Sequence, residues 1–304
     1  MINFRPTIIK VKKPSDDNLG ASFLVLLDFI KQTKPVGNGD RITIDMSAVN
    51  FSFPLLILPI SGLNKLLRQR GIQVDFTPMP KNNEYLNAIK FPFDLSSNPV
   101  NSWNDSLAQY RSKTYLPICS IPTRNDEMRE NILTTFGKIL VNQLNISGQL
   151  HSAIIYIISE IFDNIVEHAD VAEGWIMAQN YPNKQFLDVC ILDTGIGVLG
   201  SYKKAGIHEI TSDEKALQVA INGLSTKSME ETRGFGITTS RKMLVRGLKG
   251  KFLLFSGSAF YISTYEQEDT ITALDESYRW EGTVALLRIP KKIPEGFNYW
   301  NFVE

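Results

Sequence analysis

An apolar run from Phe186 to Leu192 ends at Asp193, which is followed by two spaced glycines, Gly195 and Gly197. The run, FLDVCIL, is short and bounded by polar residues, which is typical of a buried strand. A carboxylate and two glycines directly after such a strand leave backbone open at a sheet edge, where a ligand can approach closely. A simple glycine-containing turn capped by Asp193 fits the same pattern.

Upstream, the segment 149–170 has the apolar spacing of a helix and carries Glu160 and Asn164 four positions apart. Side chains at i and i+4 lie on one helix face, a turn apart. An acidic side chain and an amide on a common face can hold a water and a metal-bound phosphate oxygen, and Mg²⁺ prefers such oxygen ligands. Taken alone, a polar pair of this kind is more commonly solvated helix surface.

A second glycine pair, Gly234-Phe235-Gly236, stands directly before a helical pattern at 237–246. Free N–H groups and the positive end of the helix dipole suit a phosphate at such a position, although a flexible turn is the competing interpretation. Gly282 and Thr283 open the last predicted strand. No Gly-x-x-x-x-Gly-Lys-[Ser/Thr] segment occurs, which excludes a P-loop as the phosphate cradle.

In order and spacing, these segments resemble the boxes of the GHKL superfamily, the ATP-binding fold shared by gyrase, MutL, heat-shock chaperones and histidine kinases. SEIFDNIVEHA resembles its N box, LDTGIGV its first glycine box, RGFGI its second glycine box and EGTVALLRIP its terminal Gly-Thr strand. The likeness covers close to half of the chain. It implies a GHKL-type α/β sandwich (Bergerat fold) for residues 116–304, with ATP and Mg²⁺ as ligands.

The resemblance also implies roles for single residues. Asp193 accepts a hydrogen bond from the adenine amino group, which selects adenine over guanine. Asn164 coordinates Mg²⁺ and links it to the phosphates. Gly195 and Gly197 let the chain turn under the nucleotide, and Thr283 helps to fix the water network on the adenine side.

The segment between the two glycine boxes, residues 198–234, corresponds to the ATP lid of the family. The Gly234–Gly236 stretch at its end, with Phe235 between the glycines, holds the phosphates. Within the lid, Ser-Thr-Lys227 resembles a Thr-Lys element that often precedes the second glycine box. Lys227 then reaches a phosphate, and an exposed lid lysine is an equally good interpretation.

Glu160 bears on the reaction, because gyrase, MutL and the anti-sigma serine kinases carry Glu at this position where many histidine kinases carry Asn. A carboxylate there can act as a general base that orients a water or a substrate hydroxyl toward the γ-phosphate. The preceding helical segment, 126–145, contains no histidine. A histidine autokinase of the usual layout is therefore not expected.

Residues 1–95 alternate predicted strands and helices and form a small α/β domain. The stretch 43–76 resembles the central strand–loop–helix–strand unit of STAS domains, which act in anti-anti-sigma switches. It departs from the family at the loop, where Phe53-Pro54-Leu55 stands in place of Asp-Ser-Ser. This argues against a phosphoswitch of the usual kind, and a generic α/β binding domain remains an alternative. Residues 96–115 are polar and aperiodic, as in a linker.

The chain of 304 residues has 32 Lys and Arg and 32 Asp and Glu, so no overall charge attracts nucleic acid or an anionic membrane. Its two cysteines, Cys119 and Cys190, stand in separate apolar runs and indicate core residues in a reducing compartment. The N-terminus lacks the apolar core of a signal peptide. We expect a cytoplasmic protein that binds neither nucleic acid directly nor membrane.

Two functions fit these observations. The first is a Mg²⁺-ATP-dependent signalling ATPase or an anti-sigma-type serine/threonine protein kinase, with Glu160 as the base. The second is a non-catalytic, nucleotide-gated interaction module, in which ATP changes the contact of the STAS-like domain with a regulatory protein. A homodimer is compatible with either.

Overall fold

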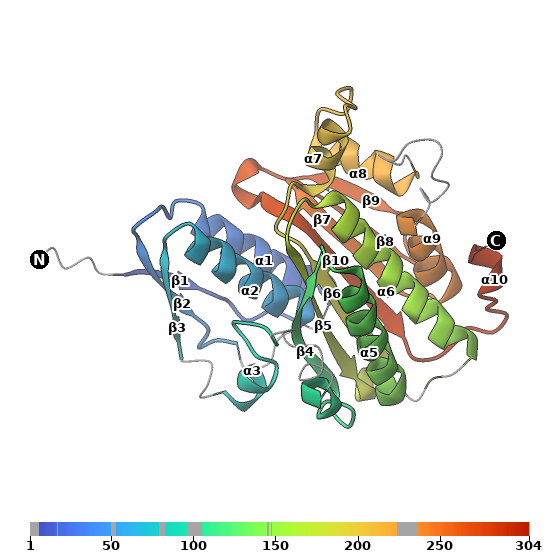
Figure 1. The fold of residues 1–304 in the computed structure, drawn as a ribbon. Coiled ribbons are helices and arrows are strands. Elements are labelled where there is room, and N and C mark those ends of the chain that lie inside the picture. The colour runs from blue at the N-terminus through green and yellow to red at the C-terminus, as the bar shows by residue number, and fades with distance from the viewer. Residues whose placement is uncertain are drawn as a thin grey trace, which may run out of the picture.

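The computed structural model describes residues 6–16, 18–49, 53–78, 83–95, 105–144, 146, 148–223 and 236–303, without the side chains of residues 144 and 165–168. The protein is a mixed α/β structure with two sheets (Figure 1). One sheet has three parallel strands in the order β1-β2-β3, and the other has seven antiparallel strands in the order β4-β5-β6-β10-β7-β8-β9.

The N-terminal part alternates strands and helices as the sequence predicted. Its elements are β1 (Thr7–Lys10), α1 (Leu19–Thr33), β2 (Arg41–Asp45), α2 (Pro54–Gln69), β3 (Gln73–Thr77) and α3 (Glu84–Ala88). Asn18 caps α1 by accepting a hydrogen bond from the Ala21 amide at 2.7 Å, and Pro54 starts α2 at a position where no amide donor is needed. Short parallel strands joined by helices follow from these local signals.

The seven-stranded sheet comes from the rest of the chain. Its strands are β4 (Tyr115–Pro122), β5 (Glu173–Tyr181), β6 (Phe186–Leu192), β7 (Lys251–Gly257), β8 (Ala259–Thr264), β9 (Thr270–Ala273) and β10 (Trp280–Pro290). The last strand, β10, lies between β6 and β7 and pairs with both. Alternate residues of β6 enter two different cores, since Val189 and Ile191 pack on one face and Cys190 and Leu192 on the other.

Helices cover one face of this sheet (Figure 1). They are α5 (Asp126–Leu144), α6 (Gly148–His168), α9 (Gly236–Lys242) and the π-helical turn η3 (Met243–Gly247). The remaining short elements are η2 (Pro182–Lys184), α7 (Gly197–Lys204), α8 (Asp213–Ile221), η4 (Glu276–Tyr278) and α10 (Trp300–Val303). Apolar side chains such as Phe136 of α5 and Phe162 of α6 fill the space between these helices and the sheet.

The helices α1 and α2 lie between the two sheets (Figure 1). One hydrophobic cluster contains Ile42 of the small sheet, Leu26 of α1, Leu56 of α2 and Leu286 of the large sheet. Gly62 lets α2 approach closely, because a Cβ there would lie 3.2 Å from Leu192 Cδ1. The N-terminal and C-terminal parts of the chain therefore share a core.

The segment predicted as a linker begins with residues 96–104, which lie outside the described residues. Further along, Leu107 and Tyr110 are buried in the core beneath α5 and α6, and Tyr110 Oη donates to the Ala88 carbonyl at 2.8 Å. Strand β4 was not predicted. It contains Pro117, which disfavours a central strand, and β4 accommodates it at the sheet edge with a register shift between Leu116 and Cys119.

Both cysteines are buried and free. Burial raises the pKa of each thiol, which agrees with the prediction that they are core residues. No helix in the described part of the chain is long and apolar enough to cross a bilayer.

A charged pair lies inside the β6–β10 ladder, where Asp188 is opposite Arg288. Both residues are buried. Nε and Nη2 of Arg288 donate to Oδ1 and Oδ2 of Asp188, each at 2.8 Å, and the guanidinium lies 4.0 Å from the centre of the Phe186 ring. Burial raises the pKa of Asp188, and the hydrogen bonds from Arg288 oppose that rise.

We expect Arg288→Met to lower the free energy of unfolding by about 3–5 kcal/mol, because the Asp188 carboxylate stays buried without its cation. Adding Asp188→Leu should recover much of this loss, since an apolar pair avoids the desolvation cost. Urea unfolding of both single variants and the double variant measures the coupling. A destabilisation by Arg288→Met that Asp188→Leu leaves unchanged would contradict this account.

Candidate functional site

Asp193 directly follows β6 and is only 1% exposed. Its Oδ1 accepts a hydrogen bond from the Gly195 amide at 2.7 Å. Its backbone is also held, since its amide donates to the Thr283 carbonyl at 2.9 Å and its carbonyl accepts from Trp280 Nε1 at 3.1 Å. The carboxyl group is thus fixed at the end of β6, beside the start of β10.

Burial raises the pKa of Asp193 to about 7, although hydrogen bonds from Gly195 and Thr283 act in the opposite direction. A carboxyl group with this pKa exchanges its proton near neutral pH. A ligand amino group that donates to it favours the ionised form and repays part of the desolvation cost.

Glycine is needed where the chain approaches Asp193. Gly282 has a φ of 102°, and a Cβ there would come within 2.5 Å of Asp193 Oδ1. A Cβ on Gly195 would lie 1.8 Å from the carbonyl oxygen of Ala169, at the end of α6. At these two positions the backbone approaches Asp193 and the end of α6 so closely that only glycine fits.

A second group of predicted residues meets where α6 and α9 pack together. Glu160 and Asn164 lie one turn apart on α6, and Asn164 Nδ2 donates to the Glu160 carbonyl at 2.6 Å. Gly236 begins α9, and a Cβ built on it would lie 2.2 Å from Glu160 Oε2 and 3.2 Å from Asn164 Nδ2. The first residue of α9 is thus in contact with both polar side chains of α6.

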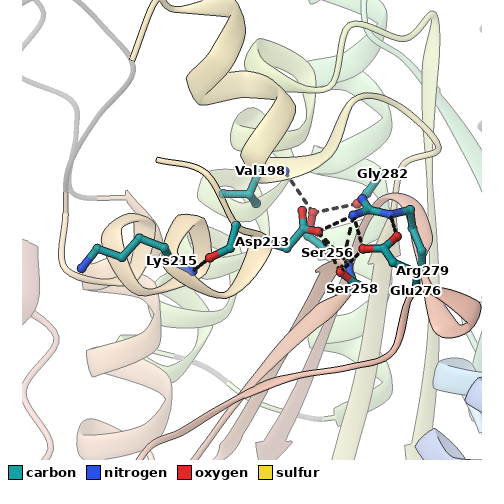
Figure 2. Close-up of polar contacts among 9 residues, drawn as sticks. Val198, Asp213, Lys215, Ser256, Ser258, Glu276, Arg279 and Gly282 are labelled. Carbon is teal, nitrogen blue, oxygen red and sulfur yellow. Dashed lines mark hydrogen bonds and ion pairs between the residues drawn. The ribbon is translucent and has the colours of Figure 1, made fainter. Parts of the chain in front are cut away.

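Ser256, which no sequence pattern marks, links the turn after β6 to the start of β10 (Figure 2). Its Oγ donates to the Gly282 carbonyl at 2.8 Å and accepts from the Val198 amide, at the start of α7, at 3.0 Å. The same oxygen lies 3.4 Å from Thr283 Oγ1. Ser256 is 1% exposed, so this buried hydroxyl group fixes the start of α7 to the first residues of β10.

A charged cluster anchors α8 next to this site (Figure 2). Asp213 Oδ2 accepts from the Ser258 amide at 3.1 Å, from Ser258 Oγ at 3.0 Å and from Arg279 Nη2 at 2.7 Å. Arg279 also pairs with Glu276, and this hydrogen bond lowers the pKa of Glu276 to about 2. In the sequence, Asp213 indicates only the start of a helix.

Part of the predicted lid, residues 198–223, forms α7 and α8 around a small core of Tyr202, Ile210 and Ala216. The residues 224–235 are outside the described part of the chain. The predictions for Lys227, Gly234 and Phe235 fall within them. Where the description resumes, Thr238 Oγ1 donates to the Ile221 carbonyl at 2.8 Å and so joins α9 to α8.

Among the described residues, no three His, Cys, Asp or Glu side chains gather where they could hold a metal ion. The role predicted for Asn164 requires one amide oxygen rather than a carboxylate cluster. Its Nδ2 is engaged by the Glu160 carbonyl. Within the described residues its Oδ1 makes no hydrogen bond, so this oxygen fits a cation that is otherwise held by phosphate oxygens.

Neither a protein-family model, nor a curated protein, nor a solved structure matches this chain.

The raised pKa of Asp193 has a consequence for stability that can be measured. Its pKa in the folded protein, about 7, is above its ordinary value of 3.8. The unfolded chain therefore loses this proton first, and the free energy of unfolding should fall as pH rises from about 4 to about 7. Over that pH window, the free energy of unfolding of Asp193→Asn should rise by up to about 4 kcal/mol relative to that of wild type.

Urea unfolding of both proteins at several pH values checks this, and comparison with the variant removes the contribution of all other groups. A stability difference that does not vary with pH would show that Asp193 is ionised in the folded protein throughout.

Proposed function

We propose that this chain binds Mg²⁺-ATP at the site formed by α6, the end of β6, the start of α9 and the start of β10. The observation that carries the proposal is the buried Asp193 carboxyl group, which is held by Gly195 and lies against the backbone of Gly282. A buried carboxyl group among glycines is suited to accept a hydrogen bond from a flat, amino-bearing ring such as adenine.

The order of the elements supports the same proposal. The resemblance to the GHKL boxes requires the N-box helix, the Asp-containing turn, the second glycine box and the Gly-Thr strand to meet, although they are distant in sequence. Here Gly236 contacts Glu160 and Asn164, and Thr283 contacts Asp193 through a backbone hydrogen bond. Phosphates of a bound nucleotide would lie near the N-terminus of α9 and the N box.

Glu160 is the residue on which catalysis depends under this proposal. Its carboxylate lies beside the first residue of α9, where it can accept a proton from a water or a substrate hydroxyl that attacks the γ-phosphate. Mg²⁺ held through Asn164 Oδ1 would neutralise charge on the phosphates. The reaction class is phosphoryl transfer from ATP, either to water or to a serine or threonine of a partner protein.

We expect Asp193→Asn to abolish ATP binding and Glu160→Gln to preserve it, since only Asp193 faces the adenine. Phosphate release by Glu160→Gln should fall by about a hundredfold or more, which is the usual contribution of a general base. Isothermal titration with ATP and Mg²⁺ measures binding, and a phosphate-release assay measures turnover.

The control is Asp163→Asn, which removes a carboxylate from the same helix where it faces Arg129 rather than Gly236. It should leave both properties unchanged. Unchanged ATP affinity in a folded Asp193→Asn protein would refute the nucleotide assignment. Equal phosphate release by wild type and Glu160→Gln would refute the role of Glu160 as base.

A second function, a nucleotide-gated interaction switch, is favoured by the contacts of the first two residues of β10, Trp280 and Glu281. Trp280 is 1% exposed and donates from Nε1 to the Asp193 carbonyl. Its ring also packs on α2, because a Cβ on Gly62 would lie 3.6 Å from its Cη2 atom. Arg70 at the end of α2 forms an ion pair with Glu281. One short segment thus contacts both the proposed adenine site and the N-terminal part.

Under this second function, nucleotide binding changes the packing of α2 and thereby the surface that the N-terminal part offers to a regulatory protein. We expect ATP to slow hydrogen exchange of amides in α2, and Trp280→Phe to weaken this effect because it removes the Nε1 donor. Arg41→Gln, which breaks an ion pair with Asp75 on the small sheet, is the matched control. Exchange in α2 that is identical with and without bound ATP would exclude this coupling.

A further inference from the structure

The first turn of α7 has no capping group in its own segment. This helix follows the Asp193 turn directly, and its N-cap residue, Ile196, makes no side-chain hydrogen bond. The first amides of a helix find no acceptor within the helix, and a buried amide without a partner carries a free-energy cost. The Val198 amide is one of these groups, so its acceptor has to come from another part of the fold.

Ser256, near the end of β7, supplies this acceptor (Figure 2). Its Oγ accepts from the Val198 amide at 3.0 Å, although the two residues are 58 positions apart in sequence. Gly197 permits this approach, because it has a φ of 66° and a Cβ there would lie 2.8 Å from Ser256 Oγ. Ser256 therefore caps α7 in place of the N-cap residue.

The same hydroxyl group holds the start of β10. A serine hydroxyl group has one proton to donate, and Ser256 donates it to the Gly282 carbonyl at 2.8 Å. Gly282 in turn lies against Asp193, since a Cβ built on it would lie 2.3 Å from the carbonyl oxygen of Asp193 and 2.5 Å from Oδ1. Loss of the hydroxyl group would release two backbone segments that adjoin Asp193.

Thr283 connects Ser256 to the carboxyl group of Asp193 by a second route. Its Oγ1 lies 3.4 Å from Ser256 Oγ, and a hydrogen bond from its side chain opposes the rise that burial causes in the pKa of Asp193. Among the described residues, no charged group contributes to this pKa, and the other opposing groups are the amide of Gly195 and the backbone of Thr283. The ionisation of Asp193 therefore depends on how tightly neutral groups enclose it.

We propose that Ser256 is a positioning residue for the adenine-binding end of the nucleotide site, where its hydroxyl group holds the start of α7 and the start of β10 in the places that enclose Asp193. The inference rests on the proposed nucleotide function and extends it. Ser256 is 1% exposed, so it acts through Val198 and Gly282 rather than by touching a ligand. The enclosure is then already formed before the nucleotide binds, which lowers the cost of ordering it.

The test compares Ser256→Ala and Ser256→Cys with wild type in isothermal titration of the full chain with ATP and Mg²⁺. Ser256→Ala removes both hydrogen bonds, whereas Ser256→Cys fills the space with a group that is a weak donor and a weak acceptor. Each variant should bind ATP about tenfold more weakly, as expected for the loss of hydrogen bonds in a buried place. A role in packing alone would make Ser256→Cys bind ATP like wild type, and this result would overturn the proposal.

A second measurement requires no nucleotide. The pH at which Asp193 ionises follows from urea unfolding of Ser256→Ala with and without Asp193→Asn, compared with the same pair of proteins that carry Ser256. Loosening the enclosure admits water, so the pKa of Asp193 should fall from about 7 toward 3.8, by about one unit. The stability difference within the Ser256→Ala pair should then level off at a lower pH than the difference within the other pair.

Ser263→Ala is the matched control, because Ser263 is also a fully buried serine, and its Oγ donates to Asp269 at 2.6 Å. It should change neither the ATP affinity nor the pKa of Asp193, and thermal melts should show that each variant is folded. Absence of ATP binding by wild type would refute the nucleotide function and this inference with it. If wild type binds ATP, full affinity in folded Ser256→Ala or an unchanged pKa of Asp193 would overturn the role of Ser256 alone.

Discussion

The pairing of β10 with β6 is the contact on which the rest of the structure depends. Its register places Val284 opposite Leu192, so the first residues of β10 meet the turn after β6, and Asp193 lies against Gly282. The same ladder buries the Asp188–Arg288 pair and places Trp280 where it contacts both Asp193 and α2. A shift of one residue would turn every side chain of β10 to the opposite core. The charged pair disfavours such a shift, because the shift would separate Asp188 from Arg288 and leave two buried charges without partners.

The chemistry of the candidate site follows from backbone as much as from side chains. Gly195 and Gly282 allow carbonyl and amide groups to surround one carboxyl group so closely that water is excluded, and this exclusion raises the pKa of Asp193. At the other end of the site, Gly236 brings α9 against Glu160 in the same way. Polar groups in both places are held by elements far apart in sequence. A ligand that spans the two ends would meet groups that are already oriented, so little reorganisation is needed on binding.

Local patterns predicted the parts of the fold that are determined locally. The apolar run before Asp193 and the helical spacing around Glu160 predicted β6 and α6, and both are present. Strand β4 was missed because Pro117 is a poor strand residue unless the strand lies at an edge. The role of Ser256 could not be predicted, since its partners Gly282 and Val198 are 26 and 58 residues away in sequence. The position of α1 between two sheets had a signal, the nearly continuous apolar run from Phe23 to Ile30, which indicates a helix buried on more than one side.

That position of α1 and α2 has a consequence for any attempt to divide the chain. The face of the seven-stranded sheet beneath them consists of large apolar side chains, among them Leu192, Leu253, Phe255, Trp280 and Leu286. If the C-terminal part were produced alone, this face would become a large hydrophobic surface exposed to water. Such surfaces drive self-association. The N-terminal part therefore keeps this apolar face of the C-terminal part out of contact with water. Proteolysis in the intervening segment would be expected to leave the two fragments together as a nicked complex.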